Sequence, residues 1–170
     1  MKKIVLSLIF LAVQYTLLAQ GDNKKEANGG FSLVINSIEN TFVVEAGGEG
    51  SVNLTDKYFI GGGGYGLTYK KENKEYALGY GGLLLGTNIF KDSCKTLKVS
   101  LLTAYGGLTV EDGTSKTKED LFVLRLMISM DVSLFKWLKI SPNLGYRILL
   151  SSKENQLSTP FFGMSFRFGN

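Results

Sequence analysis

The 170-residue sequence contains no histidine and only one cysteine, Cys94. Histidine is the commonest general base and a frequent metal ligand, so its absence removes every Ser-His and Cys-His catalytic pair. A lone thiol cannot form an internal disulfide. We therefore expect a protein that is not an enzyme and that holds no metal and no cofactor.

The sequence also lacks a strong excess of either charge. It has 19 basic and 15 acidic residues, a net charge of +4. Lys2 and Lys3 lie in an N-terminal segment that we expect to be removed, which leaves 17 basic residues and a net charge of +2. Nucleic-acid-binding domains carry a much stronger basic patch. Nucleic acid is therefore excluded as a partner.

The N-terminus has the layout of a secretory signal peptide. Lys2 and Lys3 precede an apolar run that begins at Ile4 and ends at Ala19, and the polar sequence GDNKKEAN follows. Polar residues interrupt the run, which is already shorter than the ~20 residues of a membrane-spanning helix. We predict three parts: a signal peptide over 1–19, a polar linker over 20–29 and one folded domain over 30–170.

The stretch FIGGGGYGLTY, residues 59–69, contains the spacing G-x-G-x-x-G. A dinucleotide site of this kind needs a helix directly after the glycines. The residues that follow instead alternate between apolar and polar, which predicts a long β-hairpin that turns at Glu72 and Asn73. This hairpin sets Gly63 opposite Gly82 and Tyr65 opposite Tyr80. The match to a nucleotide-binding motif is therefore coincidental.

The same alternation runs through the rest of the chain, and no stretch after the signal peptide has a helical period. One parity is entirely apolar over 122–134 and again over 138–150, whereas the other parity carries charged, polar and glycine residues. Counting a first strand near 30–38, the alternation predicts eight strands. The expected fold class is all-β: an eight-stranded antiparallel up-and-down barrel.

Two features favour a transmembrane barrel, which is apolar outside, over a soluble one. Compact connections alternate with longer polar ones at 111–120 and 151–159. Aromatic residues also lie at the strand ends: Phe59 and Tyr69 are ten residues apart, a height of ~25 Å at ~3.3 Å per residue and a tilt of ~40°. One predicted aromatic girdle contains Phe42, Tyr69, Tyr76, Phe122 and Phe162, and the other contains Phe59, Phe90, Trp137 and Phe168.

The chain finishes in an alternating aromatic strand, FFGMSFRFGN. With the signal peptide and the eight amphipathic strands, this ending resembles the small bacterial outer-membrane barrels of the OmpX and OmpA transmembrane type. A narrower resemblance, to a family of outer-membrane barrels with glycine-dense second to fourth strands, lies in two segments: AGGEGSVNLTDKYFIGGGGYGL and LGYGGLLLG. The resemblance implies a barrel in the outer membrane of a Gram-negative bacterium, and it implies no particular activity.

The parity that faces away from lipid supplies the predicted contents of the lumen. Seven glycines are expected there: Gly47, Gly62, Gly64, Gly66, Gly79, Gly81 and Gly106. We predict that Glu45 and Glu49 pair across the lumen with Arg125 and Arg147, in space that these glycines leave open. A second cluster of Asp131, Lys98 and Lys139 is expected nearer the periplasm. These pairs are predicted to close the barrel to ions.

The functional prediction is an outer-membrane barrel with a structural or interaction role, its lumen plugged by charged side chains. The alternatives are a narrow pore, a barrel that binds a small solute or lipid and, with less support from a sequence without histidine, a lipid-modifying barrel enzyme. The expected partners are outer-membrane lipid, the barrel assembly machinery during biogenesis and an unidentified protein at the extracellular loops 111–120 and 151–159.

Overall fold

The computed structural model describes residues 26–38, 41–71, 74–92, 94–113, 115–150 and 158–169. The predicted signal peptide, the turn at Glu72 and Asn73 and nearly all of the predicted loop 151–159 lie outside these stretches. Within them, no helix is long and apolar enough to cross a membrane.

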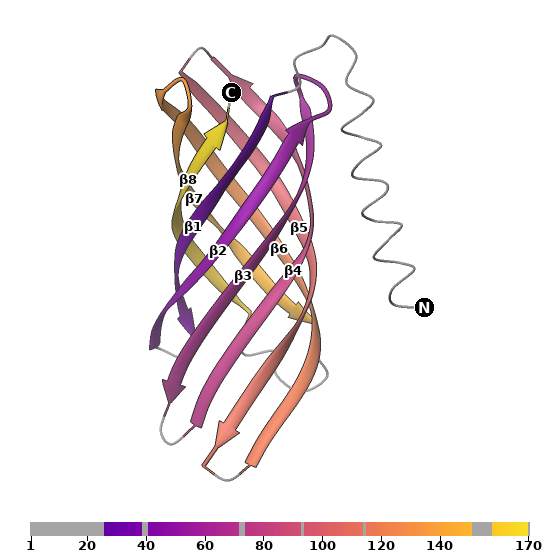
Figure 1. The fold of residues 1–170 in the computed structure, drawn as a ribbon, viewed down its shortest axis with the longest axis vertical. Coiled ribbons are helices and arrows are strands. Elements are labelled where there is room, and N and C mark those ends of the chain that lie inside the picture. The colour runs from indigo at the N-terminus through magenta and orange to yellow at the C-terminus, as the bar shows by residue number, and fades with distance from the viewer. Residues whose placement is uncertain are drawn as a thin grey trace, which may run out of the picture.

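Eight antiparallel strands form a closed barrel (Figure 1). They are β1 (Ala27–Ile38), β2 (Thr41–Asn53), β3 (Tyr58–Lys71), β4 (Lys74–Lys91), β5 (Lys95–Asp112), β6 (Ser115–Phe135), β7 (Leu138–Leu150) and β8 (Thr159–Gly169). Each strand pairs with its neighbour in the chain, and β8 pairs with β1 to close the sheet. The predicted fold, an eight-stranded antiparallel up-and-down transmembrane β-barrel, is confirmed. β1 begins three residues before the predicted boundary at residue 30.

The register of the glycine-rich hairpin is the one that the sequence predicts. Gly63 pairs with Gly82 and Tyr65 pairs with Tyr80 in the β3–β4 ladder. The stretch 59–69 is therefore the interior of a strand, and no helix follows it. A phosphate-binding loop at these glycines is excluded, because such a loop depends on the amides of a helix N-terminus.

The strands differ in length, and the longer ones extend the barrel at one end. β1, β2, β7 and β8 have 11 to 13 residues, whereas β4 and β5 have 18 and β6 has 21. The β2–β3 ladder ends at Glu45 and Leu67, but the β3–β4 ladder continues to Lys71 and Lys74. β3–β6 thus project beyond the other strands (Figure 1). We call this part the β3–β6 extension, its end of the barrel the hairpin end, and the opposite end the termini end.

The loop predicted at 111–120 is therefore wrong. β5 continues to Asp112 and β6 begins at Ser115, so the connection is a tight turn at Gly113, which has a positive φ of 54°. The segment reads as a loop because polar residues occupy both of its faces. Beyond the lipid both faces of a sheet meet water, so the apolar–polar alternation that identifies a strand disappears.

Apolar side chains cover the outside of β1, β2 and β6–β8, as the alternation predicts. Phe42 is 83% exposed and Leu126 is also exposed, whereas their neighbours Val43 and Met127 are buried. Six of the predicted girdle residues face outward: Phe42, Phe90, Phe122, Trp137, Phe162 and Phe168. A bulge in the β4–β5 ladder between Asn88 and Phe90 shifts the alternation and turns Phe90 outward.

In β3 and β4 the predicted faces are reversed. Phe59 is only 4% exposed and Tyr69 is buried, and Tyr76 packs against the core and stacks on Tyr69 with ring centroids 4.7 Å apart. These three residues are not girdle residues. Five of the predicted lumen glycines instead lie on the outward parity: Gly62, Gly64, Gly66, Gly79 and Gly81.

The reversal follows from the volume of the lumen. An eight-stranded barrel is just wide enough to be filled by side chains. β1, β7 and β8 contribute small buried polar residues to it, including Ser32, Ser141 and Ser165. The large side chains of β3 and β4, among them Tyr65 and Tyr80, fill the remaining space. Alternation identifies the two faces of a strand. Which face points into the lumen depends on how much of the lumen the side chains of the opposite strands leave unfilled.

The two predicted lumen glycines that do face inward make room for these tyrosines. A Cβ on Gly47 would overlap the ring of Tyr65, and a Cβ on Gly106 would lie 2.5 Å from the Cβ of Tyr80. A Cβ on the outward-facing Gly79 would meet no atom within 4 Å. Glycine is thus required by packing at the inward positions and not at Gly79.

This contrast predicts unequal effects of the same substitution. Gly106→Leu should lower the free energy of unfolding by about 1 to 3 kcal/mol, because it overpacks a filled lumen. Gly79→Leu should leave the stability unchanged or raise it, because the new side chain faces the apolar exterior. Urea titrations of the barrel in lipid vesicles measure both. Equal losses in the two variants would contradict the assigned faces.

Candidate functional site

The lumen holds two clusters of charged residues. The Glu45 cluster contains Glu45, Arg125 and Arg147, and all three side chains are fully buried. Arg125 and Arg147 are direct partners in the β6–β7 ladder, so two like charges point into the lumen side by side. Glu45 reaches them from β2, on the opposite wall of the barrel. Its carboxylate oxygens lie 3.3 Å from Nη1 of Arg125 and 3.1 Å from Nη1 of Arg147.

Hydrogen bonds fix the Glu45 carboxylate between the two guanidinium groups. Asn36 Nδ2 donates to Glu45 Oε2 at 3.0 Å, and the Tyr80 hydroxyl donates to Oε1. Arg125 Nη1 in turn donates to the Tyr80 hydroxyl at 3.0 Å. A buried charge is tolerated when charged partners and hydrogen bonds replace the water that it has lost.

Arg125 also lies between two aromatic rings. Its Cζ is 3.8 Å from the ring centroid of Tyr65 and 4.0 Å from that of Phe161. The two rings cover the faces of the guanidinium, and contacts of this kind are strongest when the cation is desolvated. The lumen is therefore filled at this height by rings, guanidinium groups and a carboxylate.

The Asp131 cluster lies nearer the termini end. Asp131 accepts from Lys98 Nζ at 2.5 Å, from Arg167 Nη1 at 3.1 Å and from the Ser141 hydroxyl. Nη2 of Arg167 lies 3.2 Å from Oε2 of Glu49 on β2. The Tyr65 hydroxyl donates to the other oxygen of Glu49. Through Arg167 of β8, this second layer spans the lumen from Asp131 of β6 to Glu49 of β2.

Two of the predicted pairings are wrong. Glu49 pairs with Arg167 and not with Arg125 or Arg147, because Glu49 lies four residues further along β2 and so nearer the termini end than Glu45. Lys139 is not a partner of Asp131: its Nζ donates to Asn28 Oδ1 at 3.4 Å. Asp131 already has Lys98 and Arg167 as partners.

The sequence prediction did not include Arg167, Tyr65 and Tyr80 in the network. Arg167 lies on the inward parity of β8 together with Ser165, and this parity is the signal that could have identified it. The sequence pattern places the tyrosines on the outside with the apolar parity of β3 and β4. Their hydroxyls had no predicted role in the lumen for that reason.

The two clusters can seal the barrel, but they do not resemble a catalytic site. Their members are held by one another, with three carboxylates against the four cations Arg125, Arg147, Arg167 and Lys98. Among the residues that the structure describes, no group of three or more acidic, cysteine or histidine side chains is arranged to hold a metal ion.

The sequence matches no protein-family model and no curated protein. Solved structures do share the fold. Neisserial surface protein A superposes with a TM-score of 0.71 at 9% identity, over 89% of this chain and 100% of that one. The N-terminal β-barrel domain of OprF from Pseudomonas aeruginosa has a TM-score of 0.62 at 10% identity, over 86% and 100% of the two chains. Ail, the attachment invasion locus protein of Yersinia pestis, has a TM-score of 0.59 at 8% identity, over 86% and 97%.

At these identities the similarity establishes the fold alone. The chain has the fold of the small outer-membrane β-barrels of the OmpX and OmpA type.

Proposed function

We propose that this chain is an outer-membrane protein with a sealed lumen that acts through its surface at the hairpin end. The observation that carries the proposal is the Arg125–Glu45–Arg147 bridge, whose three side chains have no exposure to solvent. A conducting barrel needs a continuous aqueous path, and charges that line such a path are hydrated. The Asp131 cluster closes the same path a second time.

The β3–β6 extension is the surface that suits an interaction role. It projects beyond the other strands and carries exposed ion pairs between Lys70 and Glu75, Lys74 and Asp112, and Lys116 and Glu111, at 3.1, 3.6 and 3.1 Å. Exposed pairs of this kind contribute little to stability, so they are available to a partner. Two of the similar structures are named as a surface protein and an attachment protein, in agreement with a role outside the cell.

The location can be tested by fractionation. We expect the mature protein to sediment with outer membranes and to refold in detergent to a β-rich form whose gel mobility changes on boiling. The apolar exterior, with Phe42, Leu126 and Leu144 exposed, requires lipid or detergent around it. Recovery of the folded protein from the periplasm without detergent would refute this location.

The orientation predicts a labelling pattern on intact cells. Because the N-terminus of an exported barrel starts in the periplasm, the hairpin end should face the exterior. Ser115 lies at the hairpin end and is exposed, whereas the exposed Cys94 lies at the termini end. Ser115→Cys in a Cys94→Ser background should react with an impermeant maleimide, and native Cys94 should not. Labelling of Cys94 alone would show that the barrel has the opposite orientation.

A further inference from the structure

The backbone ladder between β6 and β7 is interrupted within the barrel wall. Ser129 pairs with Asn143 and Val132 pairs with Ile140 in one register, but the two residue pairs between them are missing. Pro142 explains the interruption, because proline has no N–H to donate to β6. In the described residues, the other seven ladders run without a missing pair, apart from one bulge between β4 and β5. Lipid supplies no water to replace a lost backbone hydrogen bond, so the wall is weakened at this point.

Flexible side chains cover the outside of the interruption. Met130 lies opposite Pro142 on the outward face of β6, and Pro142 pairs on its other side with Met164 of β8. Met130 and Met164 are 41% and 40% exposed. Methionine is unbranched and adapts its shape to a moving surface. The two strands can therefore separate here without the outer surface losing its apolar cover.

On the lumen side, Asp131 bridges the interruption. The Ser141 hydroxyl donates to Asp131, and these two residues are one of the pairs that the ladder lacks. Nη1 of Arg167 reaches the same carboxylate from β8 at 3.1 Å, and β7 lies between β6 and β8 in the sheet. All three side chains are buried. Side-chain bonds thus join the strands where the backbone ladder does not.

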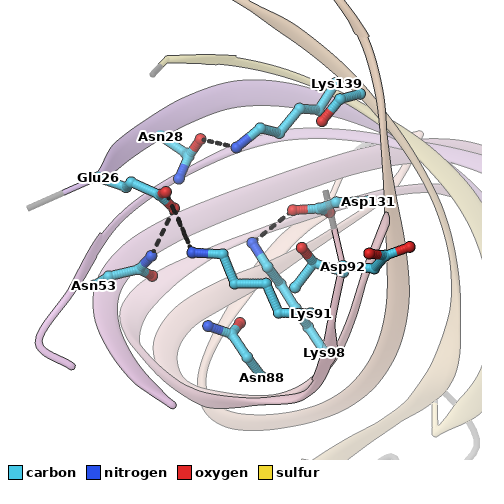
Figure 2. Close-up of a pocket in the computed structure, with 11 residues that line it drawn as sticks. Glu26, Asn28, Asn53, Asn88, Lys91, Asp92, Lys98, Asp131 and Lys139 are labelled. Atoms are coloured by element: carbon cyan, nitrogen blue, oxygen red, sulfur yellow. Dashed lines mark hydrogen bonds and ion pairs between the residues drawn. The ribbon is translucent and has the colours of Figure 1, made fainter. Parts of the chain in front are cut away.

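A polar pocket of about 100 Å³ lies behind this part of the wall, at the termini end of the lumen (Figure 2). Asp131, Ser133 and Lys139 contribute to its lining, and the last two are the ladder pair that follows the interruption. Figure 2 shows the ion pair of Lys98 with Asp131 at this pocket. The pocket is therefore the space that an opening between β6 and β7 reaches.

We propose that the β6–β7 seam at Pro142 is a lateral gate, held shut on the lumen side by the hydrogen bond of Ser141 to Asp131. When this bond is released, the two strands separate at Met130 and Pro142, and the pocket becomes continuous with the surrounding lipid. The Glu45 cluster lies nearer the hairpin end and has no contact with Asp131 or Ser141. The gate can therefore open sideways while the lumen stays closed along its axis.

Hydrogen exchange of the refolded barrel in detergent, followed by mass spectrometry, measures local opening of the seam. Pro142→Ala restores an N–H that β7 can donate to β6, so exchange over 128–134 and 139–144 should slow about tenfold. Ser141→Ala removes the hydrogen bond that holds the gate shut and should speed exchange over the same segments about tenfold. In the Pro142→Ala background, Ser141→Ala should change it less than about threefold, because the restored backbone bond holds the strands together.

A matched serine variant controls for general destabilisation. Ser32 Oγ lies 2.6 Å from Ser165 Oγ across the uninterrupted β1–β8 ladder, and both residues are buried. Ser32→Ala removes this buried link and should leave exchange over 128–134 and 139–144 unchanged. Equal exchange of these segments in the parent and in Pro142→Ala would overturn the proposal, even if Ser141→Ala fails to fold. An equal effect of Ser141→Ala in the two backgrounds would overturn it as well.

The direction of opening is tested with a thiol that lines the pocket. Ser133→Cys in a Cys94→Ser background places a cysteine there. In lipid vesicles, a maleimide confined to the bilayer should label it about tenfold more slowly once Pro142→Ala is added, in proportion to the reduced opening. A water-soluble maleimide enters from the termini end and should label both proteins at the same rate. Equal labelling of both proteins by the bilayer-confined reagent would exclude an opening toward lipid.

Discussion

Replacing Glu45 by glutamine is expected to lower the free energy of unfolding by about 3 to 5 kcal/mol, the usual effect of removing one partner from a buried ion pair. Glu45 is the carboxylate between Arg125 and Arg147, which are direct neighbours across the β6–β7 ladder. Without its charge, two buried guanidinium groups face each other with no compensating anion. Urea unfolding of the barrel in lipid vesicles measures the loss.

Two controls separate the charge from the shape. Glu75→Gln removes a carboxylate from the exposed pair with Lys70 and should change the stability by less than about 1 kcal/mol. A triple variant, Glu45→Leu with Arg125→Met and Arg147→Met, should recover most of the stability lost in Glu45→Gln, because a buried charge network can often be replaced by apolar groups of similar volume. If Glu45→Gln is as stable as the parent, the Arg125–Glu45–Arg147 bridge does not stabilise the barrel.

Conductance is expected to appear only when one arginine is removed from each of the two charge clusters. Arg125→Ala empties the space between the rings of Tyr65 and Phe161, but Arg167 still joins Asp131 to Glu49 nearer the termini end. The double variant Arg125→Ala/Arg167→Ala opens both layers beside the remaining Glu45–Arg147 pair and should give steady single-channel currents in planar bilayers. Each single alanine variant should stay closed.

The matched control for this prediction keeps the volume and removes the charge. Arg125→Met/Arg167→Met has the same net charge as the double alanine variant, but its longer side chains still fill the lumen. It should remain closed. Currents in the methionine variant equal to those in the alanine variant would mean that charge, and not filled volume, prevents ions from passing.

The sequence predicts the architecture well because the period-2 alternation is strong wherever one face of a strand meets lipid. β7 and the part of β6 from Phe122 onward illustrate this: every second residue is apolar, and Arg125 and Arg147 fall on the other parity. The hairpin register of β3 and β4 also follows, since a short polar turn centred at 72 and 73 leaves one symmetric way to pair the arms.

The faces of β3 and β4 could not be predicted in the same way. Both parities of these strands are uncharged in their central parts, with the tyrosines on one parity and glycines on both, so either face suits lipid. Tyr65 and Tyr80 turn inward because the opposite wall contributes serines and asparagines that leave the lumen unfilled. That complementarity depends on which strands lie across the barrel from each other, and a strand-by-strand pattern does not contain it.

The pairing of the lumen charges was predictable only in outline. The charged residues that face inward follow from parity, and the pairing of Glu45 with Arg125 and Arg147 is predicted. The choice of partner depends on strand stagger around the closed sheet, which places Glu49 beside Arg167 of β8 and Lys139 beside Asn28 of β1. The stagger is set by ladder registers such as Asn36 with Phe161, which join residues from opposite ends of the chain.

The most direct measurement of the central claim is single-channel recording from the unmodified mature protein in planar bilayers. The Arg125–Glu45–Arg147 bridge and the Arg167 layer predict a silent bilayer at both voltage polarities, with insertion verified by protease protection or by a co-inserted tag. Steady, reproducible current steps from the parent protein would contradict a sealed lumen, and the narrow-pore alternative would then take its place.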